Sequence, residues 1–525
     1  MTKKIYSLLA AVVVSTVCFS NNLLDEAVNS FNRSDYAVSG HYLEEYLSSG
    51  ASIELDQERI DYMRLAIMEN VDSFKYVTPA LDFIGKYPKS MYLNSVLSFL
   101  GSAYHMNGDY EKAVQVFNMC NADRLDIDNA NRKTLHHAVS YKYLDSLDNA
   151  VVLLNTLAYS DPRYDVHSDY YKGIVAYKQA KYDDAVEFFS YSKANNIYKI
   201  PSLLYLAEIA LVCQDYDQAT LCAEPVLNSR TDSATIWQAQ RITATALFHK
   251  KEYAQSAAIL APYMSNVKQP DRSDRYYLGM DYYYLGQYSE AIGQLQYATL
   301  QNDAMSENAY LHIGLAALQL KDMNRAEIAF QLGSGIDLDA AVNEQLLYNY
   351  AMTLYETSFS PFSDAVTVFE TFINKYPKSK NLDKASRSLI DVYENSTNYS
   401  NAIASIEKLN NPPKNVMHSK QLLYFRRGNM YYGSGDYKNA IKDYTSALAL
   451  RQYDKELAEK AYLWRGETYF ALGQYQEAKK DYQSAIDATV NIYGQDYMMS
   501  VYGHAYSAYK MRDFENARSE WKSML

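Results

Sequence analysis

Aromatic and small apolar residues recur along this chain at a long and nearly constant interval. An aromatic residue followed three positions later by alanine marks each period, and successive marks are separated by 34 to 39 residues. The aromatic residue of the mark is Tyr110, Tyr182, Tyr216, Tyr288, Phe362, Tyr399, Tyr437, Tyr475 or Phe514. Leu147, Tyr253 and Met323 keep the same phase with one of the two residues exchanged. A fixed period of this length predicts a solenoid of stacked units.

Each period also contains an internal pattern that predicts two helices joined by a tight turn. In one of the later periods, the small residue Gly428 precedes the aromatic Tyr431 by three positions. Gly435 then stands two positions before the periodic Tyr437, with the polar Asp436 between them. Glycine is favoured just after a helix ends, and a short polar residue is favoured where the next helix begins. Neither helix buries its apolar face alone, so neighbouring units must stack.

This pattern resembles the tetratricopeptide repeat family. The match is clearest in residues 94–125, 421–452 and 459–490, where the small, aromatic, glycine and alanine positions coincide with those of the family. The family's tryptophan near the start of the first helix is absent from these repeats, and several steps exceed the usual 34 residues. The resemblance covers roughly residues 21–525. It implies an all-α fold, a tetratricopeptide-type α-solenoid in which helix-turn-helix repeats stack into a right-handed superhelix.

Two of the loops that interrupt the rhythm indicate where segments of the solenoid join. Residues 265–271 contain a proline and several charges, and residues 409–414 contain two adjacent prolines, which cannot continue a helix. We therefore expect N-terminal repeats over residues 21–264, central repeats over 265–408 and C-terminal repeats over 409–525.

The first twenty residues form a separate element. Two lysines at positions 3 and 4 precede the mostly apolar run 5–17, and small or polar residues follow. A positive start, a short apolar run and a polar exit predict a secretory signal peptide over residues 1–20. The alternatives are a lipoprotein signal ending at Cys18 and a buried first helix of the solenoid.

A second observation bears on localisation. The segments that end in Tyr-Pro-Lys-Ser at Ser90 and Ser379 are near-duplicates. They are similar to the version of this repeat found in bacterial cell-envelope proteins. We therefore expect an exported bacterial protein that is periplasmic or associated with the outer membrane.

Composition narrows the class of partner. The formal net charge is −12 and the chain has no long basic run. Nucleic acid is therefore excluded as a partner, because its binding depends on Lys and Arg contacts to phosphate. Tyrosine accounts for 53 of 525 residues, more than the packing positions of the repeat require. Three cysteines follow the signal peptide, and an odd number fits buried apolar side chains better than a disulfide framework.

The sequence contains no motif for catalysis, phosphate binding or metal ligation. A Gly-x-Gly-x-x-Gly motif, a glycine-rich Lys-Ser/Thr loop and a Gly-x-Ser-x-Gly elbow are all missing. His136 and His137 are adjacent, so on a helix they point about 100° apart and make a poor metal pair. We expect no enzyme activity, no cofactor and no metal.

The resemblance also indicates which residues face a partner. In the family, the first helix of each repeat lines the concave side and presents its second, fifth, ninth and twelfth positions to a groove. In the second half of the chain many of these positions and their neighbours are aromatic: Tyr276, Tyr283, Phe425, Tyr432, Trp464, Phe470, Tyr502, Tyr506 and Tyr509. Tyr and Trp give large contact areas at low entropic cost, so we expect an aromatic groove for an extended or helical peptide. The alternative is that these rings pack between neighbouring first helices.

These observations predict a non-catalytic scaffold that mediates protein–protein interactions in the cell envelope through its concave groove. One alternative is the sensor ectodomain of a longer signalling protein. Another is a carbohydrate-binding envelope protein, since Tyr and Trp platforms also stack on sugars. The last helix begins near Glu515 and lacks the polar cap that usually protects a solenoid end. A homo-oligomer formed through the C-terminal end is therefore a further expectation.

Overall fold

The computed structural model of the chain describes residues 22–49, 57–71, 76–160, 162–357, 364–396 and 398–523. Within these ranges all regular secondary structure is helical. The predicted all-α solenoid of stacked helix pairs is confirmed. The predicted signal peptide lies outside the described residues. The chain divides into two compact units, Met1–Lys250 and Lys251–Leu525.

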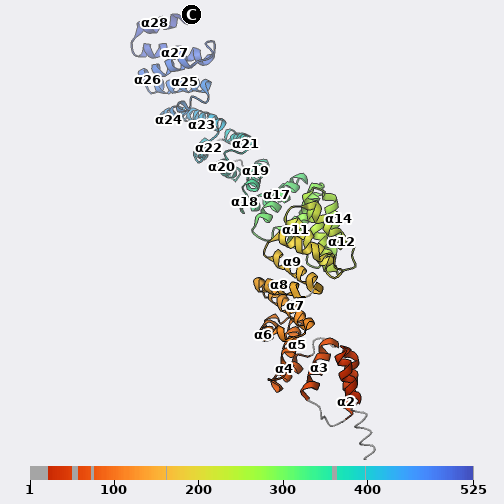
Figure 1. Ribbon diagram of the computed structural model, residues 1–525. Helices are drawn as coiled ribbons and strands as arrows, with labels where there is room; N and C mark the ends of the chain where they lie inside the picture. The colour runs from red at the N-terminus through yellow and green to blue at the C-terminus, as the bar shows by residue number, and fades with distance from the viewer. Residues whose placement is uncertain are drawn as a thin grey trace, which may run out of the picture. The chain divides into compact units, whose positions relative to one another are not determined.

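The first unit contains a helical segment over residues 22–32, twelve further α-helices and two short 3₁₀ turns among its described residues. The helices are α2 (Tyr36–Ser48), α3 (Gln57–Val71), α4 (Val77–Lys86), α5 (Leu93–Met106), α6 (Tyr110–Met119), α7 (Ile127–Tyr143), α8 (Leu147–Ser160), α9 (Asp165–Lys178), α10 (Tyr182–Ser192), α11 (Lys199–Val212), α12 (Tyr216–Leu227) and α13 (Ser233–His249). The 3₁₀ turns are η1 (Ala122–Arg124) and η2 (Pro162–Tyr164). Consecutive helices such as α5 and α6 pack side by side (Figure 1).

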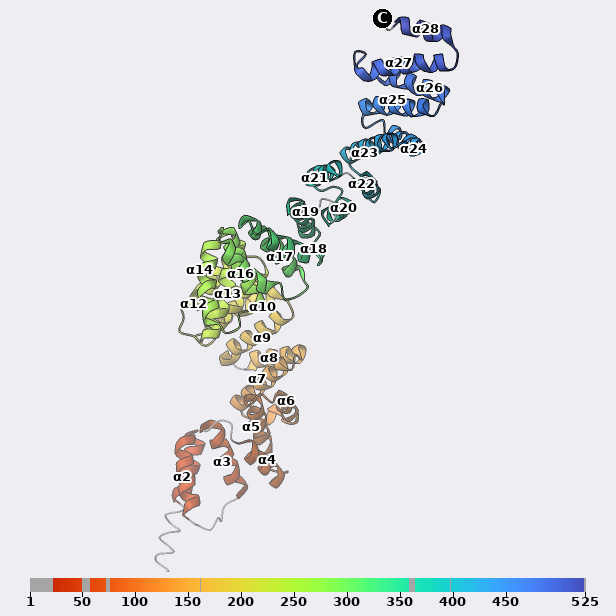
Figure 2. The ribbon, with the colours of Figure 1, turned by 180° about the vertical axis from the view of Figure 1, so that it is seen from behind.

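The second unit continues the same alternation of first and second helices. Its helices are α14 (Tyr253–Asn266), α15 (Arg272–Tyr284), α16 (Tyr288–Ala298), α17 (Ala304–Gln319), α18 (Met323–Ser334), α19 (Ala340–Thr357), α20 (Asp364–Lys375), α21 (Leu382–Asn395), α22 (Tyr399–Ile406), α23 (Lys414–Gly433), α24 (Tyr437–Ala449), α25 (Lys455–Ala471), α26 (Tyr475–Ala488), α27 (Gln495–Lys510) and α28 (Phe514–Ser523). Pairs such as α25 and α26 lie side by side (Figure 2). The predicted joints at 265 and 409 fall at the ends of α14 and α22 and stay predictions.

The periodic aromatic residue is the first residue of the second helix in most pairs. Tyr437 begins α24 and Tyr475 begins α26, as the pattern predicts. The residue before it caps the helix in several pairs; the Asp436 side chain accepts a hydrogen bond from the backbone N–H of Asn439 at 3.3 Å. The turn glycine Gly435 has φ of +78°, a left-handed conformation that a side chain would strain.

The periodic alanine and the small residue of the first helix lie where paired helices approach most closely. Ala440 is fully buried, and so is the ring of Tyr444 one turn further along α24. That ring lies directly over Gly428 of α23, because a Cβ atom added there would be 2.7 Å from Tyr444 Cε1. Glycine is therefore needed at this position for space rather than for backbone freedom.

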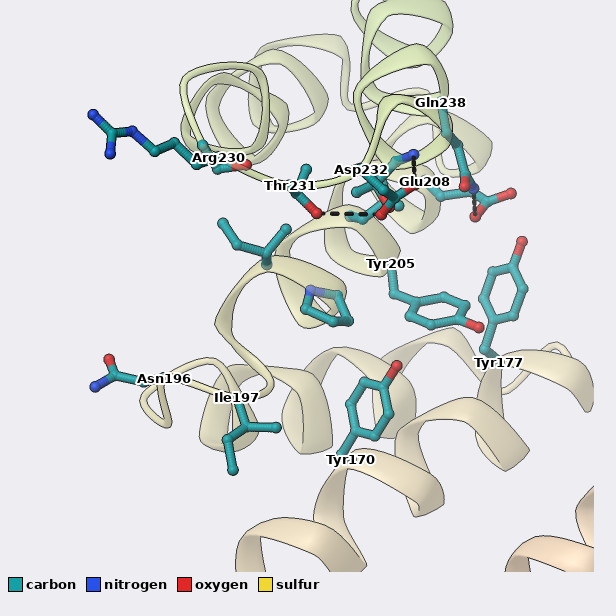
Figure 3. A pocket seen from close by; sticks show the side chains of 15 residues that line it. Tyr170, Tyr177, Asn196, Ile197, Tyr205, Glu208, Arg230, Thr231, Asp232 and Gln238 are labelled. Carbon is teal, nitrogen blue, oxygen red and sulfur yellow. Dashed lines mark hydrogen bonds between the residues drawn. The ribbon is translucent and has the colours of Figure 1, made fainter. Parts of the chain in front are cut away.

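The first helices of consecutive pairs form one side of each unit, which we call the first-helix face. In the second unit, α15, α17, α19, α21, α23, α25 and α27 contact one another in succession. In the first unit, α9 and α11 meet through the rings of Tyr177 and Tyr205, whose centroids are 5.3 Å apart, and α11 contacts α13. Tyr170 of α9, Tyr205 of α11 and Gln238 of α13 face a shared hollow (Figure 3).

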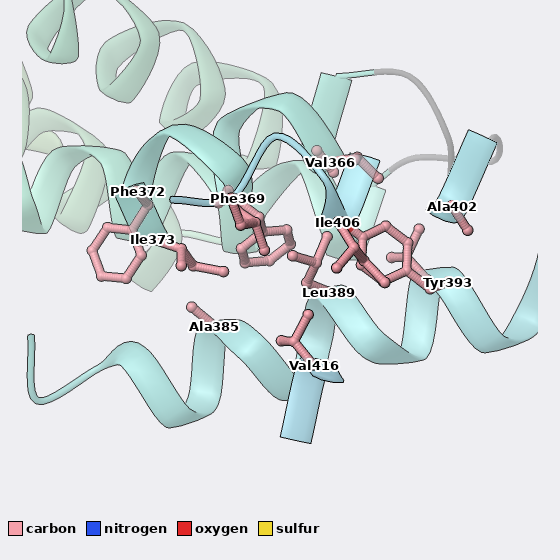
Figure 4. Close-up of a cluster of buried hydrophobic side chains, with 14 of the residues drawn as sticks. Val366, Phe369, Phe372, Ile373, Ala385, Leu389, Tyr393, Ala402, Ile406 and Val416 are labelled. Carbon is pink, nitrogen blue, oxygen red and sulfur yellow. The ribbon is translucent and has the colours of Figure 1, made fainter. Parts of the chain in front are cut away.

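The core is continuous from one helix pair to the next. In the second unit, Phe369 and Phe372 of α20 pack with Leu389 and Tyr393 of α21 and with Val416 at the start of α23 (Figure 4). All five side chains are buried. Each pair thus covers the apolar face of its neighbour, and the stability of such an array arises from nearest-neighbour contacts.

Two ion pairs with buried carboxylates link first and second helices in the last repeats. Arg427 of α23 donates two hydrogen bonds to the carboxylate of Asp443 in α24, at 2.6 and 2.8 Å. Arg465 of α25 makes the same two bonds to Asp481 in α26, at 2.6 and 2.7 Å. Bidentate pairing satisfies the buried carboxylates, which are costly to bury alone.

Asp281 of α15 is a buried carboxylate with fewer hydrogen bonds than Asp443 or Asp481. Its Oδ2 accepts a hydrogen bond from the Ser256 hydroxyl at 2.5 Å, and its Oδ1 has no partner among the described residues. Burial raises the pKa of this carboxyl to about 7. The folded state therefore binds a proton at Asp281 more tightly than the unfolded chain does.

Replacing Gly428 tests the close approach of α23 and α24. We expect Gly428→Ala to lower the free energy of unfolding by about 1–3 kcal/mol, because the added methyl group overpacks against Tyr444. Gly433→Ala in the same helix is the control, since an added Cβ meets nothing within 4 Å there. Urea unfolding followed by circular dichroism measures both. Equal unfolding midpoints for the two variants would contradict the contact.

The pKa of Asp281 predicts a pH dependence of stability. An unfolded Asp titrates near pH 4 and the folded one near pH 7, so its contribution to stability is highest below pH 4 and falls as the pH rises to 7. Between pH 5 and pH 8 the ionisation of Asp281 should lower the free energy of unfolding by about 2–3 kcal/mol. Asp281→Asn should remove that loss, whereas Asp383→Asn, at an exposed position of α21, should keep it. Urea unfolding at both pH values compares them, and parallel pH profiles for both variants would disprove the effect.

Candidate binding surfaces

The nine predicted groove residues all lie on first helices of the second unit. They are Tyr276 and Tyr283 on α15, Phe425 and Tyr432 on α23, Trp464 and Phe470 on α25, and Tyr502, Tyr506 and Tyr509 on α27. Their contacts differ along the unit, and their role in binding stays a prediction.

The rings on α15 are engaged with the next first helix, α17. The Tyr276 hydroxyl donates a hydrogen bond to Asn308 Oδ1 at 2.9 Å, and burial raises its pKa. Tyr283 meets the His312 ring edge to face, with centroids 4.8 Å apart. At this part of the unit the contacts fit the alternative interpretation, in which the rings pack between neighbouring first helices.

The rings on α23 and α25 are half-buried and contact one another. Tyr432 lies edge to face with Trp464, with centroids 5.4 Å apart, and burial raises the pKa of its hydroxyl. Phe425 is tilted against the buried Tyr444 at 5.9 Å. These rings join α23 to α25 and to α24, and they retain part of their surface for contact with another molecule.

The aromatic residues near the end of the chain form a larger group, which we call the C-terminal aromatic cluster. It comprises Phe470, Tyr502, Tyr506, Tyr509 and Trp521. Tyr506 lies at its centre and stacks on Phe470 with centroids 5.2 Å apart. Tyr502 and Tyr509 are 53% and 45% exposed, so the cluster offers ring surface to solvent. Sequence analysis missed Trp521 because it belongs to α28, a second helix, and was never aligned with the groove positions.

A hollow of the first unit lies on the first-helix face of α9, α11 and α13. This hollow, which we call the tyrosine cavity, has a volume of about 700 Å³. Tyr170 and Tyr177 of α9 and Tyr205 of α11 supply its aromatic wall. The opposite wall is formed by α13 and by the loop of residues 229–232 that precedes it.

Two carboxylates give the tyrosine cavity its charge. Glu208 of α11 accepts a hydrogen bond from Gln238 Nε2 at 3.3 Å. Burial, with the charge of Glu208, raises the pKa of Tyr177, so this hydroxyl stays protonated. Asp232 caps α13 and accepts hydrogen bonds from the hydroxyl and backbone N–H of Thr235 at 2.7 and 3.0 Å. These bonds lower the pKa of Asp232 and keep it ionised.

Sequence analysis did not identify the tyrosine cavity. The groove positions were counted in repeats that align well with the family, and the repeats of α9 and α11 were not among them. The periodic pattern also says nothing about the loop before α13, which supplies Asp232. The signal that could have found the site is the recurrence of Tyr170, Tyr177 and Tyr205 on consecutive first helices.

The described residues include no group of three His, Cys, Asp or Glu side chains that could hold a metal ion. His136 stacks on His105 at 4.7 Å, whereas His137 packs against Tyr141, so the two adjacent histidines point to different neighbours. The cysteines of the described residues, Cys120, Cys213 and Cys222, are unbridged. Over the same part of the chain, every helix is too short or too polar to cross a membrane.

Comparison with protein families identifies the repeat. Family models described as tetratricopeptide repeat match residues 276–334, 345–379 and 425–489. These matches confirm the resemblance found in the sequence. No curated protein matches the chain.

Several solved structures are similar to the chain at low identity. A tetratricopeptide repeat protein from Parabacteroides merdae is 13% identical, with 63% of this chain and 98% of that one covered and a TM-score of 0.23. The apo form of the quorum sensor NprR from B. thuringiensis is 12% identical, with 62% and 96% covered and a TM-score of 0.36. The Cut9–Hcn1 hetero-tetramer of APC/C is 13% identical, with 97% and 94% covered and a TM-score of 0.28. Such scores carry no information about a partner of this chain.

Two alanine variants separate the packing and surface roles of the C-terminal aromatic cluster. We expect Tyr506→Ala to lower the free energy of unfolding by about 1–3 kcal/mol, because it removes the ring at the centre of the cluster. Tyr502→Ala should cost less than about 1 kcal/mol, because that ring is more than half exposed. Thermal unfolding followed by circular dichroism measures both. A larger loss for Tyr502→Ala than for Tyr506→Ala would contradict this assignment.

Proposed function

This chain is a tetratricopeptide-repeat protein, and we propose that it is a non-catalytic scaffold that binds a protein partner on its first-helix face. Repeat arrays of this kind form extended surfaces that hold other proteins. The observation that carries the proposal is the tyrosine cavity, which the side chains of α9, α11 and α13 surround without filling. A hollow of about 700 Å³ is large enough to bury a short segment of a partner.

The chemistry of this surface supports a peptide as the bound segment. Tyrosine side chains provide wide, rigid contact surfaces and lose little conformational entropy when they bind. The hydroxyl and carboxylate groups beside the rings can fix the orientation of a backbone or side chain. The C-terminal aromatic cluster is the candidate for a second contact. Its exposed rings also support self-association through this part of the chain.

The location of the scaffold is part of the proposal. The charged, apolar and polar segments of residues 1–20 support export across a bacterial inner membrane. The exported chain would act in the periplasm or at the outer membrane. Its partner would then be an envelope protein.

An affinity experiment tests function and location together. Residues 21–525 are immobilised and incubated with an envelope extract and, separately, with a cytoplasmic extract of the producing cell. We expect one or a few proteins to be retained in stoichiometric amounts from the envelope extract. Thr231→Arg should reduce their retention at least tenfold, because it places a large side chain in the tyrosine cavity. Mass spectrometry and gel densitometry measure the retained proteins.

Thr371→Arg is the control, since it makes the same charge change at an exposed position of α20. Tyr502→Ala reports on the C-terminal aromatic cluster in the same assay, and light scattering of this variant reports on self-association. Retention of polysaccharide alone would favour the carbohydrate-binding alternative and contradict the scaffold. Retention from the cytoplasmic extract alone would contradict export.

A further inference from the structure

The tyrosine cavity carries an excess of negative charge. Glu208 and Asp232 are the acidic residues of its wall, and Arg230 is the basic one. The Arg230 side chain points away from the hollow, whereas Glu208 and Asp232 lie over it (Figure 3). Asp232 is ionised, since its hydrogen bonds to Thr235 lower its pKa. A ligand that enters the cavity therefore meets negative charge that no side chain in its wall neutralises.

The Tyr205 ring is placed to receive a flat group. One of its faces is stacked on Phe189, with centroids 4.8 Å apart and ring planes 3° from parallel. The edge-to-face contact with Tyr177 restrains the Tyr205 ring laterally. In Figure 3, Tyr205 lies between Tyr170 and the side chains of Glu208 and Asp232. One face of the Tyr205 ring is thus covered by Phe189. Its other face is directed across the hollow toward the carboxylates of Glu208 and Asp232.

A cation fits this arrangement better than a neutral group. The face of an aromatic ring is electronegative, so it attracts a cation placed above it. A carboxylate on the far side of the same cation adds a charge-assisted hydrogen bond. Arginine suits both contacts at once, because its guanidinium is planar, stacks on rings and donates several hydrogen bonds in one plane. Lysine offers a point charge without a face to stack.

We propose that the tyrosine cavity binds an arginine side chain from an extended segment of the partner protein, with the guanidinium stacked on Tyr205 and paired with Glu208 and Asp232. This inference rests on the proposed function and specifies the partner's chemistry. The hydrogen bond from Gln238 Nε2 holds Glu208 in place before the ligand arrives. Such preorganisation reduces the cost of ordering the site on binding.

A small probe tests the inference without the unidentified partner. N-acetyl-L-arginine N-methylamide is titrated against residues 21–525, and binding is followed by saturation-transfer difference NMR of the probe. The matched neutral probe is N-acetyl-L-citrulline N-methylamide, which keeps the shape and loses the charge. We expect saturable binding of the arginine probe and about tenfold weaker binding of the citrulline probe.

Variants assign the binding to this cavity. Glu208→Gln keeps the shape of the side chain and should weaken the arginine probe about fivefold or more. Glu187→Gln, at an exposed position of α10, makes the same change in net charge and should leave affinity unchanged. Tyr205→Phe should retain binding because the ring face remains, and Tyr205→Leu should lose it. Circular dichroism checks each fold, and the isosteric Glu208 variant remains decisive if Tyr205→Leu does not fold.

Equal binding of the two probes, or equal effects of Glu208→Gln and Glu187→Gln, would overturn the inference. Binding of chitotriose at the cavity in place of the arginine probe would also overturn it and favour a sugar ligand. If the envelope extract yields a partner that Thr231→Arg releases while the arginine probe fails to bind, the scaffold function stands and this inference fails. If the probe binds and no partner is retained, the cavity binds arginine but the scaffold function is contradicted.

Discussion

The contact between a glycine on the first helix and a large ring on the second helix sets the geometry of several repeats. Gly101 lies under Phe117, Gly173 under Phe189, Gly314 under Phe330 and Gly428 under Tyr444, in each case 16 positions later in the chain. A side chain on the glycine would occupy the space of the ring. The two helices are therefore so close at this point that only the hydrogen atom of glycine fits between them. Because the ring is fully buried, the remaining packing of the pair is arranged around it.

This contact leaves the first-helix face free to vary. The ring that packs on the glycine lies inside the pair, whereas Tyr170, Tyr177 and Tyr205 project from α9 and α11 toward the hollow. Stacking between pairs then depends on neighbours such as Phe189 and Tyr205, which share one ring contact. Tyr205 thus serves both packing and surface, with one face for each. A binding surface can arise in such a fold without loss of the core, because the two tasks fall on opposite faces of the same side chain.

The sequence predicted the repeat closely because its signals are local. The positions of Tyr437 and Tyr475 at helix starts, and the left-handed glycine before each of them, follow from turn chemistry within a few residues. The placement of groove residues on first helices followed from the same register. Their contacts could not be predicted, because the approach of Tyr432 to Trp464 depends on how neighbouring pairs stack. The tyrosine cavity was missed for the related reason that Asp232 belongs to a loop, where the periodic pattern carries no information.

The ion pairs of the last repeats have a consequence for how such a chain can change in length. Arg427 and Asp443 belong to one helix pair, and Arg465 and Asp481 belong to the next, with the same geometry in each. Each charged residue of these pairs has its partner inside its own repeat. A gene duplication that copies the whole repeat therefore copies the neutralised pair as well. Loss of a whole repeat likewise leaves no unpaired charge in the remaining repeats. Evolution can therefore lengthen or shorten this region in complete repeats, whereas a break inside a repeat would expose an unpaired arginine or aspartate to the core.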